Sequence, residues 1–310
     1  MALSVYAKNA LRANQTNDGW TKLYNEVPES AKILDIGCST GNFGAELIKN
    51  KQCTVVGLDI NEDDLKVAQK HLTNVFKRNI ERDNIDDLGK FDVVIMADVI
   101  EHLIDPVTAL QKVKNQLNPG GMLIFSVPNM ANFATRLELL AGRFTYTEYG
   151  LLDETHLHYY DRVELEKVLA RAGFQVTEYN NSVRDVPREA AEDLLKSVGL
   201  TADKKFWELA THIDSITFQF IGIAKPGKAK HVDVSTKTPH DFISDMIDTI
   251  EARGKEQQNA LRADLQAQLK AMEAARDTIE AQLKLIENSK GWKAVSKLYK
   301  AKERLTSKKR

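Results

Sequence analysis

Residues 33–60 have the sequence ILDIGCSTGNFGAELIKNKQCTVVGLDI, and this stretch decides the fold. Its first apolar run ends at Gly37 and predicts a buried strand, residues 41–49 predict a helix, and residues 54–59 predict a second strand. A strand, a helix and another strand in succession form the crossover unit of a parallel sheet. Such sheets bind ligands at the carboxyl ends of their strands, so the turns that follow these two strands form the candidate site.

Residues 1–226 continue this alternation of apolar runs and amphipathic stretches, which is typical of a doubly wound α/β sheet. Further strands are expected at residues 75–79, 91–97, 122–127, 174–179 and 216–224. Further helices are expected at residues 61–72, 105–117 and 161–172, and the second of these stops before Asn118-Pro-Gly-Gly121. Asp105, followed by Pro, and Asp161, followed three residues later by Glu, are expected to cap two of these helices.

Glycines and carboxylates around the first turn point to a nucleoside-type ligand. Gly37 and Gly41 let a backbone approach a ligand closely, and Asp59 ends the second strand, where a carboxylate can accept both hydroxyls of a ribose. A dinucleotide fingerprint requires glycine where this chain has Ser39, and Asp35 would repel a pyrophosphate but suits a cationic amino group. The same turn matches the Gly-x-Ser-x-Gly elbow of hydrolases, but that elbow follows several strands, whereas only about 30 residues precede this one.

The turn resembles motif I of class I S-adenosylmethionine-dependent methyltransferases, and four further motifs follow in the family's order. They are Phe91-Asp-Val-Val-Ile, Asp98-Val-Ile-Glu-His-Leu103, Leu117-Asn-Pro-Gly-Gly121 and Ser126-Val-Pro-Asn129. The second of these is similar to ubiquinone-pathway O-methyltransferases and methionine-biosynthesis-W-like proteins. Residues 136–160 are similar to methyltransferases encoded with cell-surface polysaccharide genes. The resemblance implies an enzyme with a Rossmann-like, seven-stranded sheet that uses S-adenosyl-L-methionine.

The resemblance also implies which residues hold this cofactor. They are Asp35, Gly37, Cys38, Gly41, Asp59, Ile60, Asn79, Ile80 and Asp98. By this resemblance Asp35 lies near the methionyl amino group, Asp59 holds the ribose and Ile60 packs on the adenine. Asn79 stands where such enzymes usually have Asp, and its amide oxygen can still accept a hydrogen bond from the adenine amino group.

Two histidines, His102 and His156, are the candidate catalytic residues for methyl transfer. Asp98, Glu101 and His102 are similar to a metal-binding triplet of ubiquinone-pathway relatives, in which a divalent cation would polarise a hydroxyl. The alternative is that Glu101 and His102 only start a helix and bond to the scaffold. Asp153 precedes His156 by three residues and could orient it as a general base. The alternative is a structural histidine in a lid.

Three functions follow from these observations. The favoured one is O-methylation of a sugar or a glycan-terminal group in cell-surface polysaccharide biosynthesis. The second is O-methylation of a small aromatic or quinone-type hydroxyl, and the third is a non-catalytic coiled-coil interaction protein with a cofactor-binding scaffold. The insertion at residues 183–209, with expected helix starts at Pro187 and Asp203, is either an acceptor lid or a dimer surface.

The remainder of the chain divides into a linker at residues 227–240, a helix at 241–287 and a basic amphipathic tail at 288–310. The helix has an apolar seam that consists of Leu265, Leu269, Met272, Ile279, Leu283 and Ile286, interrupted by Arg276 and preceded by Ile243 and Ile250 in a register that shifts near Gly254. So narrow a seam on so long a helix predicts a coiled coil and a homo-oligomer. The alternative is a solvated helix that packs on its own domain.

The formal net charge of -1 is unevenly distributed. Residues 288–310 hold nine Lys or Arg and one Glu, and the rest of the chain is acidic, which argues against a nucleic-acid partner. With Trp292, Val295 and Tyr299 on one helical face, this tail suits peripheral contact with an anionic membrane; a frayed basic terminus is the alternative. The chain has two cysteines outside any ligand spacing, which predicts a cytoplasmic setting.

Overall fold

The computed structural model describes residues 17–228, 239–291, 293–295 and 297–298. The chain divides into two compact units, residues 1–232 and residues 233–310. Most of the predicted linker, residues 227–240, lies outside the described residues.

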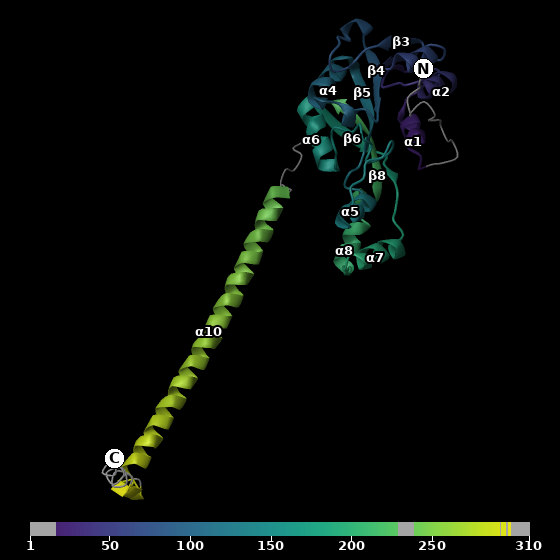
Figure 1. The fold of residues 1–310 in the computed structure, drawn as a ribbon. Helices are drawn as coiled ribbons and strands as arrows, with labels where there is room; N and C mark the ends of the chain where they lie inside the picture. Colours follow the sequence, from purple (N-terminus) through teal and green to yellow (C-terminus); the bar gives the residue numbers. More distant parts are fainter. Residues whose placement is uncertain (1–16, 229–238, 292, 296, 299–310) are drawn as a thin grey trace, which may run out of the picture. The chain divides into compact units, whose positions relative to one another are not determined.

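The first unit is built around one mixed sheet (Figure 1). Its strands are β1 (Lys32–Ile36), β2 (Thr54–Asp59), β3 (Asn74–Lys77), β4 (Phe91–Ala97), β5 (Leu117–Pro128), β6 (Phe174–Tyr179), β7 (Ser182–Val183) and β8 (Thr217–Pro226). The order is β3-β2-β1-β4-β5-β8-β6, with β8 antiparallel to both of its neighbours. These are the seven strands expected from the sequence, and the two-residue β7 pairs with β8 as an eighth.

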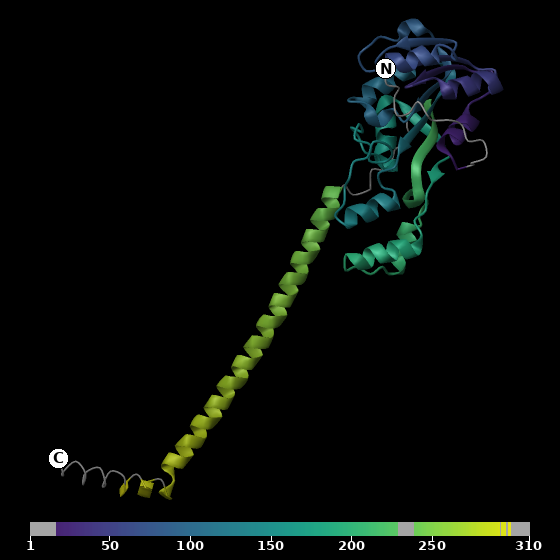
Figure 2. The same cartoon turned by 45° about the vertical axis from the view of Figure 1, so that its right-hand side comes forward.

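Helices cover both faces of the sheet, with α4 and α6 on one face and α1, α2 and α3 on the other (Figures 1 and 2). The helices of this unit are α1 (Gly19–Glu26), α2 (Asn42–Lys51), α3 (Glu62–Ala68), α4 (Pro106–Asn115), α5 (Phe133–Leu140), α6 (Arg162–Ala172), α7 (Arg188–Ser197), α8 (Lys204–Ala210) and α9 (Ile213–Ile216), with 3-10 turns η2 (Asp86–Leu88) and η3 (Ile100–His102). The predicted doubly wound α/β architecture is confirmed.

The central strands are buried on both faces because successive side chains point to opposite sides. Leu34 and Val94 pack in the core that includes α4 and α6, while Ile33 and Val93 pack in the core that includes α1 and α2. The continuous apolar runs of the sequence follow from this double burial.

The expected capping residues begin the helices as predicted. One carboxylate oxygen of Asp105 accepts a hydrogen bond from the amide of Thr108 at 3.1 Å, and Asp161 accepts one from the amide of Glu164 at 2.8 Å. Gly173 ends α6 with a φ of 85°, a left-handed conformation that favours glycine.

The strand expected to begin at residue 122 begins at Leu117 and includes residues 118–121, and the helix before it ends at Asn115. Phe91 of β4 pairs with Leu117, and Val93 pairs with Met122, so the intervening residues bulge from the ladder. A Pro-Gly-Gly sequence therefore marks a bulge here and not a break between elements.

The helix expected to run from residue 61 to residue 72 ends earlier, at Ala68. Beyond it the amide of Lys70 bonds to the carbonyl of Val67 and the amide of His71 to that of Ala68, which tightens the chain into three-residue turns. This tightening turns Leu72 inward, where it is buried in the core.

The insertion forms a small core of its own. Phe133 and Leu137 of α5 pack with Ala191 and Leu195 of α7 and with Ala210 of α8. The predicted helix starts are both confirmed. Pro187 immediately precedes α7, and the carboxylate of Asp203 accepts a hydrogen bond from the amide of Phe206 at 2.9 Å at the start of α8.

The second unit contains one long helix, α10 (Pro239–Asn288), of 50 residues. At 1.5 Å per residue its length is about 75 Å. Five seam side chains are between 51% and 71% exposed, namely Leu265, Leu269, Met272, Ile279 and Leu283. The long helix is confirmed, and the coiled coil remains a prediction. None of the helices within the described residues combines the length and apolarity that a membrane span requires.

Candidate active site

A cavity of about 530 Å³ lies at the carboxyl ends of β1, β2 and β4. The chain continues from β1 to β2 on one side and returns to β4 on the other, so this is the point where the strand order reverses. Open α/β sheets bind their ligands at such points. The cavity therefore lies where the sequence predicts the site.

Most of the predicted cofactor residues line this cavity. They are Asp35, Gly37, Cys38, Asp59, Ile60, Asn79, Ile80 and Asp98. Gly41 is the exception. It precedes α2 with a φ of 77°, and a Cβ there would lie 3.1 Å from the Cα of Ala68. Backbone conformation and close packing against α3 therefore require this glycine.

Gly37 is also restricted by its surroundings. Its φ is 78°, and a Cβ would lie 2.6 Å from the Cγ2 methyl of Val99. Glycine at this position allows the turn after β1 to pack tightly against the chain that follows β4. The cavity wall thus depends on the close approach of Gly37, after β1, to Val99, after β4.

Asp59 is held by the backbone of the turn that it faces. Its Oδ2 accepts a hydrogen bond from the amide of Ser39, and its Oδ1 accepts one from the amide of Asn61, both at 2.8 Å. The hydroxyl of Ser39 donates to the buried carboxylate of Asp64 at 2.8 Å, so it holds the loop together and is not available as a hydrolase-type nucleophile. A carboxylate offers about four acceptor positions, which leaves Asp59 able to receive two hydroxyls.

Asp35 is a buried carboxyl group in the cavity wall. Burial, and then the nearby charge of Asp59, raise the pKa of Asp35 to about 7. Burial of the Cys38 thiol, and then the nearby charges of Asp35 and Asp59, raise the pKa of this cavity-lining group. A cationic ligand would stabilise the ionised form of Asp35.

Asn79, the residue expected to contact an adenine, already takes part in hydrogen bonds within its own turn. Asn79 Oδ1 already accepts hydrogen bonds from the amides of Glu81 at 2.8 Å and Arg82 at 3.3 Å. A carbonyl oxygen has two lone pairs, so the expected bond from an adenine amino group to this oxygen is disfavoured, and the Nδ2 group is the better contact. Ile60 is 66% exposed at the cavity, and Ile80 is buried in its wall.

Asp98 lies at the end of β4 in an unusual backbone conformation, with a φ of 54°. Its Oδ1 accepts hydrogen bonds from the hydroxyl of Ser126 at 3.0 Å and from Nε2 of Gln219 at 2.5 Å. Burial raises the pKa of Asp98, and these two bonds oppose the rise. Strained residues of this kind cluster at functional sites.

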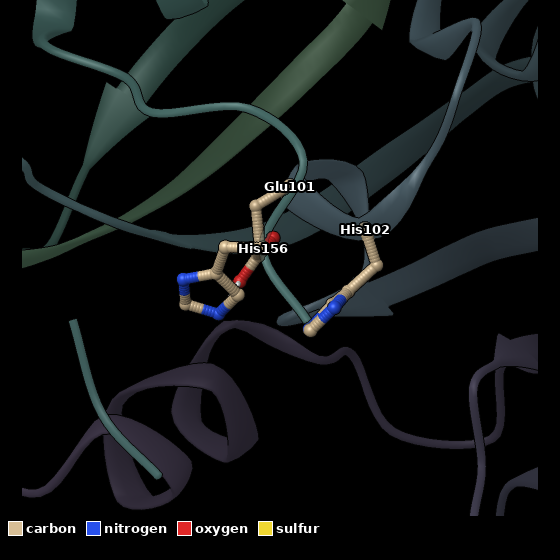
Figure 3. Close-up of side chains that lie close together, drawn as sticks. All are labelled: Glu101, His102 and His156. Carbon is tan, nitrogen blue, oxygen red and sulfur yellow. Dashed lines mark ion pairs between the residues drawn. The ribbon is translucent and has the colours of Figure 1, made fainter. Parts of the chain in front are cut away.

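Glu101, His102 and His156 come together beside the cavity (Figure 3). One ligand atom from each lies within 4.8 Å of the others, and the two imidazole centroids are 4.8 Å apart. Nε2 of His156 is 4.0 Å from Oε1 of Glu101. The sequence predicted both histidines as catalytic candidates but did not predict that they would meet.

Hydrogen bonds from a distant loop hold this cluster together. The amides of Leu157 and His158 donate to the carbonyl of Glu101 at 2.9 and 3.0 Å. Nδ1 of His102 lies 3.1 Å from the carbonyl oxygen of Thr155 and also 3.1 Å from its hydroxyl. These contacts hold the loop between α5 and α6 against η3, which places His156 next to Glu101.

The carboxyl group of Glu101 is 1% exposed, and neither of its oxygens has a hydrogen-bond partner among the described residues. Burial, and then Asp98, raise the pKa of Glu101 well above its usual range. Burial, followed by His102, lowers the pKa of His156. The hydroxyl of buried Tyr160 also lacks a partner within the described part of the chain. Unsatisfied buried polar groups of this kind indicate a missing ion, water or ligand.

The predicted metal triplet fits a divalent cation only in part. Asp98 directs its Oδ1 to Ser126 and Gln219, whereas Glu101 and His102 group with His156. The structure therefore groups His156, and not Asp98, with Glu101 and His102, and the metal triplet expected from the sequence remains a prediction. A carboxylate and two imidazoles are suitable donors for a divalent cation.

Asp153 was expected to orient His156. One oxygen of Asp153 accepts hydrogen bonds from the amide and the hydroxyl of Thr155 at 2.8 and 2.6 Å, which shapes the turn. Nδ1 of His156 lies 3.2 Å from the carbonyl oxygen of Leu151. The imidazole orientation is thus tied to a backbone carbonyl five residues earlier.

The cavity also has an aromatic wall that was not expected from the sequence. Trp20 of α1 and Phe43 of α2 both line it, and their rings meet edge to face at 5.3 Å. The signal was available in the chain before β1, where Asp18 precedes an amphipathic helix and accepts a hydrogen bond from the amide of Thr21 at 3.0 Å.

A series of aromatic rings leads from His156 to the surface of the loop. Centroid distances are 6.4 Å from His156 to Tyr159, 6.2 Å from Tyr159 to Phe144 and 5.3 Å from Phe144 to Tyr146. Phe144 is 43% and Tyr146 55% exposed. We call Tyr159, Phe144 and Tyr146 the aromatic track.

The sheet order, the turn after β1 and the acidic end of β2 together define a class I methyltransferase fold with its cofactor cleft. A family model described as "Methyltransferase domain" matches residues 10–179, more than half of the chain. The chain therefore belongs to the methyltransferase domain family, whose class I members use S-adenosylmethionine, and the fold expected from the sequence is confirmed.

Individual relatives agree with this assignment. The chain is 31% identical over 123 residues to a ubiquinone biosynthesis O-methyltransferase of Actinobacillus pleuropneumoniae, which covers 36% of this chain and 52% of the relative. It is 28% identical over 153 residues to the protein of the same name from Thiobacillus denitrificans, covering 47% of this chain and 66% of the relative. The chain spans about half the length of the first curated relatives that it matches.

Solved structures are more distant. An S-adenosylmethionine-dependent methyltransferase from Clostridium acetobutylicum is 18% identical, with a TM-score of 0.44, and the match covers 72% of this chain and 96% of that one.

Proposed function

We propose that this chain is an O-methyltransferase that transfers the methyl group of S-adenosylmethionine to a hydroxyl oxygen. One observation carries the proposal. The cavity that holds the predicted cofactor residues is also lined by His102, and His102 adjoins the buried pair Glu101 and His156. Groups able to receive or redistribute a proton thus lie at one end of the cofactor cleft.

The reaction asks little of the protein besides positioning and removal of a proton. The acceptor oxygen bonds to the methyl carbon, the sulfur–methyl bond breaks, and the hydroxyl proton passes to a base. His156 is the favoured base because burial lowers its pKa and keeps the imidazole neutral. His102, which lines the cavity directly, is the other candidate.

The favoured acceptor is a sugar or glycan-terminal hydroxyl. The aromatic track supports this choice, because it continues from His156 to exposed Phe144 and Tyr146. Exposed aromatic rings suit an extended ligand with apolar faces and polar edges, which sugar rings possess. We further propose that the reaction belongs to cell-surface polysaccharide biosynthesis.

The alternative acceptor is a small aromatic or quinone-type hydroxyl. The names of the relatives from Actinobacillus pleuropneumoniae and Thiobacillus denitrificans favour it. This alternative requires only the cavity itself, which Trp20 and His102 help to line, and leaves the aromatic track unused.

Methyl transfer from labelled S-adenosylmethionine to two acceptor panels distinguishes these proposals. One panel contains mono- and oligosaccharides with free or phosphorylated termini, and the other contains catechol-type phenols. Transfer to saccharides that falls in a Phe144→Ala, Tyr146→Ala variant supports the glycan proposal. Transfer to phenols alone, unaffected by that variant, supports the alternative. Transfer to neither panel by protein that binds the cofactor would contradict both.

We propose that α10 joins copies of this chain in a homo-oligomeric coiled coil. The support is its exposed seam of Leu265, Leu269, Met272, Ile279 and Leu283 on a helix of 50 residues. Light scattering should give a multiple of the chain mass for the natural protein and one chain mass after Leu269→Asp and Leu283→Asp. A monomeric natural protein would contradict this.

We propose that the basic tail, residues 288–310, holds the protein at the anionic inner face of a membrane from the cytoplasm. The support is its net charge and the exposed Val295 and Leu298; Trp292 and Tyr299 lie outside the described residues. Flotation with anionic liposomes should recover the full chain but not one that ends at residue 287. Equal recovery of both would contradict the proposal.

A further inference from the structure

The buried carboxyl of Glu101 has no partner among the described residues, although its surroundings exclude water almost completely. An unpaired acid of this kind costs free energy unless something binds it. Its carboxyl group lies between the imidazole rings of His102 and His156 (Figure 3). These three side chains are therefore the candidate ligands of a bound group.

The backbone around the cluster fixes its geometry. The carbonyl of Glu101 accepts the amides of Leu157 and His158, and Nδ1 of His156 lies 3.2 Å from the carbonyl oxygen of Leu151. With Nδ1 bonded to a carbonyl, the imidazole presents Nε2 to Glu101 at 4.0 Å. A bond from one ring nitrogen to a carbonyl is the usual support behind a metal-binding histidine.

We propose that Glu101, His102 and His156 form a binding site for a divalent first-row transition ion such as Zn²⁺. Ligand atoms around one tetrahedral Zn²⁺ lie about 3.4 Å apart, given bond lengths of about 2.1 Å. The three ligand atoms already lie within 4.8 Å of one another, so shifts of about 1 Å would bring them onto one ion.

This site differs in one ligand from the Asp98, Glu101, His102 triplet expected from the sequence. Asp98 is engaged by Ser126 and Gln219, and His156 takes its place. Two imidazoles favour Zn²⁺, Fe²⁺ or Co²⁺ over Mg²⁺, which prefers oxygen ligands. Occupancy of the site does not depend on the proposed function. With an ion bound, His156 would be a ligand and not the base, and the ion would lower the pKa of the acceptor hydroxyl instead, a role that rests on the proposed function.

The test is Co²⁺ binding to the metal-free full chain, followed by visible absorption, with competition by Zn²⁺ and by Mg²⁺. The natural protein should take up one Co²⁺ per chain and release it to Zn²⁺ but not to millimolar Mg²⁺. Glu101→Gln and His156→Ala should each weaken binding by more than about 100-fold, because even residues behind metal ligands change affinity by 10- to 100-fold. His158→Ala is the matched control and should bind Co²⁺ normally.

A crystal of the natural protein soaked in Zn²⁺ gives a readout that does not depend on the stability of any variant. The anomalous peak should lie within bonding distance of Glu101, His102 and His156. No Co²⁺ uptake by the natural protein would overturn the proposal. Loss of binding in Asp98→Asn with retention in His156→Ala, or a peak on Asp98, would replace it with the triplet expected from the sequence. Because none of these readouts involves methyl transfer, failure here and failure of the proposed function can be told apart.

Discussion

The two ends of the cleft differ in how their carboxylates are held. At the cofactor end, each oxygen of Asp59 accepts a hydrogen bond from a backbone amide. At the acceptor end, neither oxygen of Glu101 has a partner within the described residues, and the hydroxyl of Tyr160 also lacks one. The described residues therefore satisfy the carboxylate at the first end, whereas the second end has the arrangement that the proposed ion would complete.

The two ends also differ in how the chain builds them. Ser39 and Asp59 are 20 residues apart in one strand, helix, strand unit. His102 and Thr155 are 53 residues apart, and they meet because a loop folds back onto η3. The difference teaches that local sequence can build the cofactor end of the cleft, while the proposed acceptor end depends on long-range assembly. Four variants test this contrast, in decreasing order of expected effect.

Replacement of His156 should affect chemistry most. With the acceptor found in the panels, His156→Ala should lower kcat by about 10²- to 10⁴-fold, because a positioned acid or base contributes that much. His158→Ala, two residues away, should change kcat by less than about threefold. Steady-state kinetics at saturating cofactor give both values, and normal turnover in His156→Ala would remove this residue from the mechanism.

Replacement of Asp59 should affect cofactor binding most. Asp59→Ala should raise the Kd for S-adenosylmethionine by about 100-fold, because hydrogen bonds to a charged group contribute about 1.5–3 kcal/mol. Asp63→Ala removes a carboxylate that pairs with Lys66 on α3 and should leave the Kd unchanged. Isothermal calorimetry measures both, and equal Kd values for the two variants would break the cofactor assignment.

Replacement of Gly37 should affect folding of the cofactor end. Gly37→Ala forces a side chain into a φ of 78° and places its Cβ 2.6 Å from Val99. We expect a loss of about 2–3 kcal/mol in the free energy of unfolding. Gly120 has a similar φ of 83°, but nothing lies within 4 Å of the position that a Cβ would take, so Gly120→Ala should cost only about 1 kcal/mol. Equal losses in denaturant titrations would show that the contact with Val99 is unimportant.

The pKa of Asp35 predicts the smallest effect. Because it is raised to about 7, Asp35 is largely neutral at pH 6 and ionised at pH 8. Affinity for the cationic cofactor should therefore rise with pH across this window, by at most about tenfold per pH unit, and the slope should decrease in Asp35→Asn. The charge of Asp59 also raises the pKa of Asp35, so the pH dependence of cofactor affinity should be measured in Asp59→Ala as well.

The same pKa predicts the pH dependence of stability without cofactor. The folded-state pKa of Asp35 is raised above the ordinary value of 3.8, so the folded protein holds this proton more tightly than the unfolded chain does. Its contribution is present at low pH and is lost as the pH rises toward 7. The measurement is the denaturant midpoint of unfolding of the natural protein minus that of Asp35→Asn, at pH 5 and at pH 8. An equal difference at the two pH values would contradict the raised pKa of Asp35.

The sequence predicted the parts of the fold that depend on local physics. Burial on both faces produces the apolar runs of the strands, and capping fixes helix starts such as Asp161 and Asp203. The bulge in β5 was missed because a Pro-Gly-Gly sequence suits both a turn and a bulge, and only the pairing of Phe91 with Leu117 decides between them. The early end of α3 was missed because Leu72 turns inward to fill the core.

The site, like the fold, could be predicted from the sequence only where it depends on local structure and strand order. Asp35 and Asp59 end adjacent strands, so topology alone brings them to one cavity. The grouping of His156 with Glu101 depends on the amides of Leu157 and His158, which bond to a carbonyl more than fifty residues earlier. No periodicity or spacing encodes such a contact, and for this reason the sequence did not group His156 with Glu101 and His102.

The central claim is that one cleft has a preformed cofactor end and a separate acceptor end. The most direct test is calorimetric titration of S-adenosylmethionine into the natural protein and into His156→Ala, with methyl transfer measured on the same samples. The account predicts equal Kd values and a loss of transfer confined to His156→Ala. A Kd that rises in parallel with the loss of transfer would contradict it, because the two ends would then form a single binding unit.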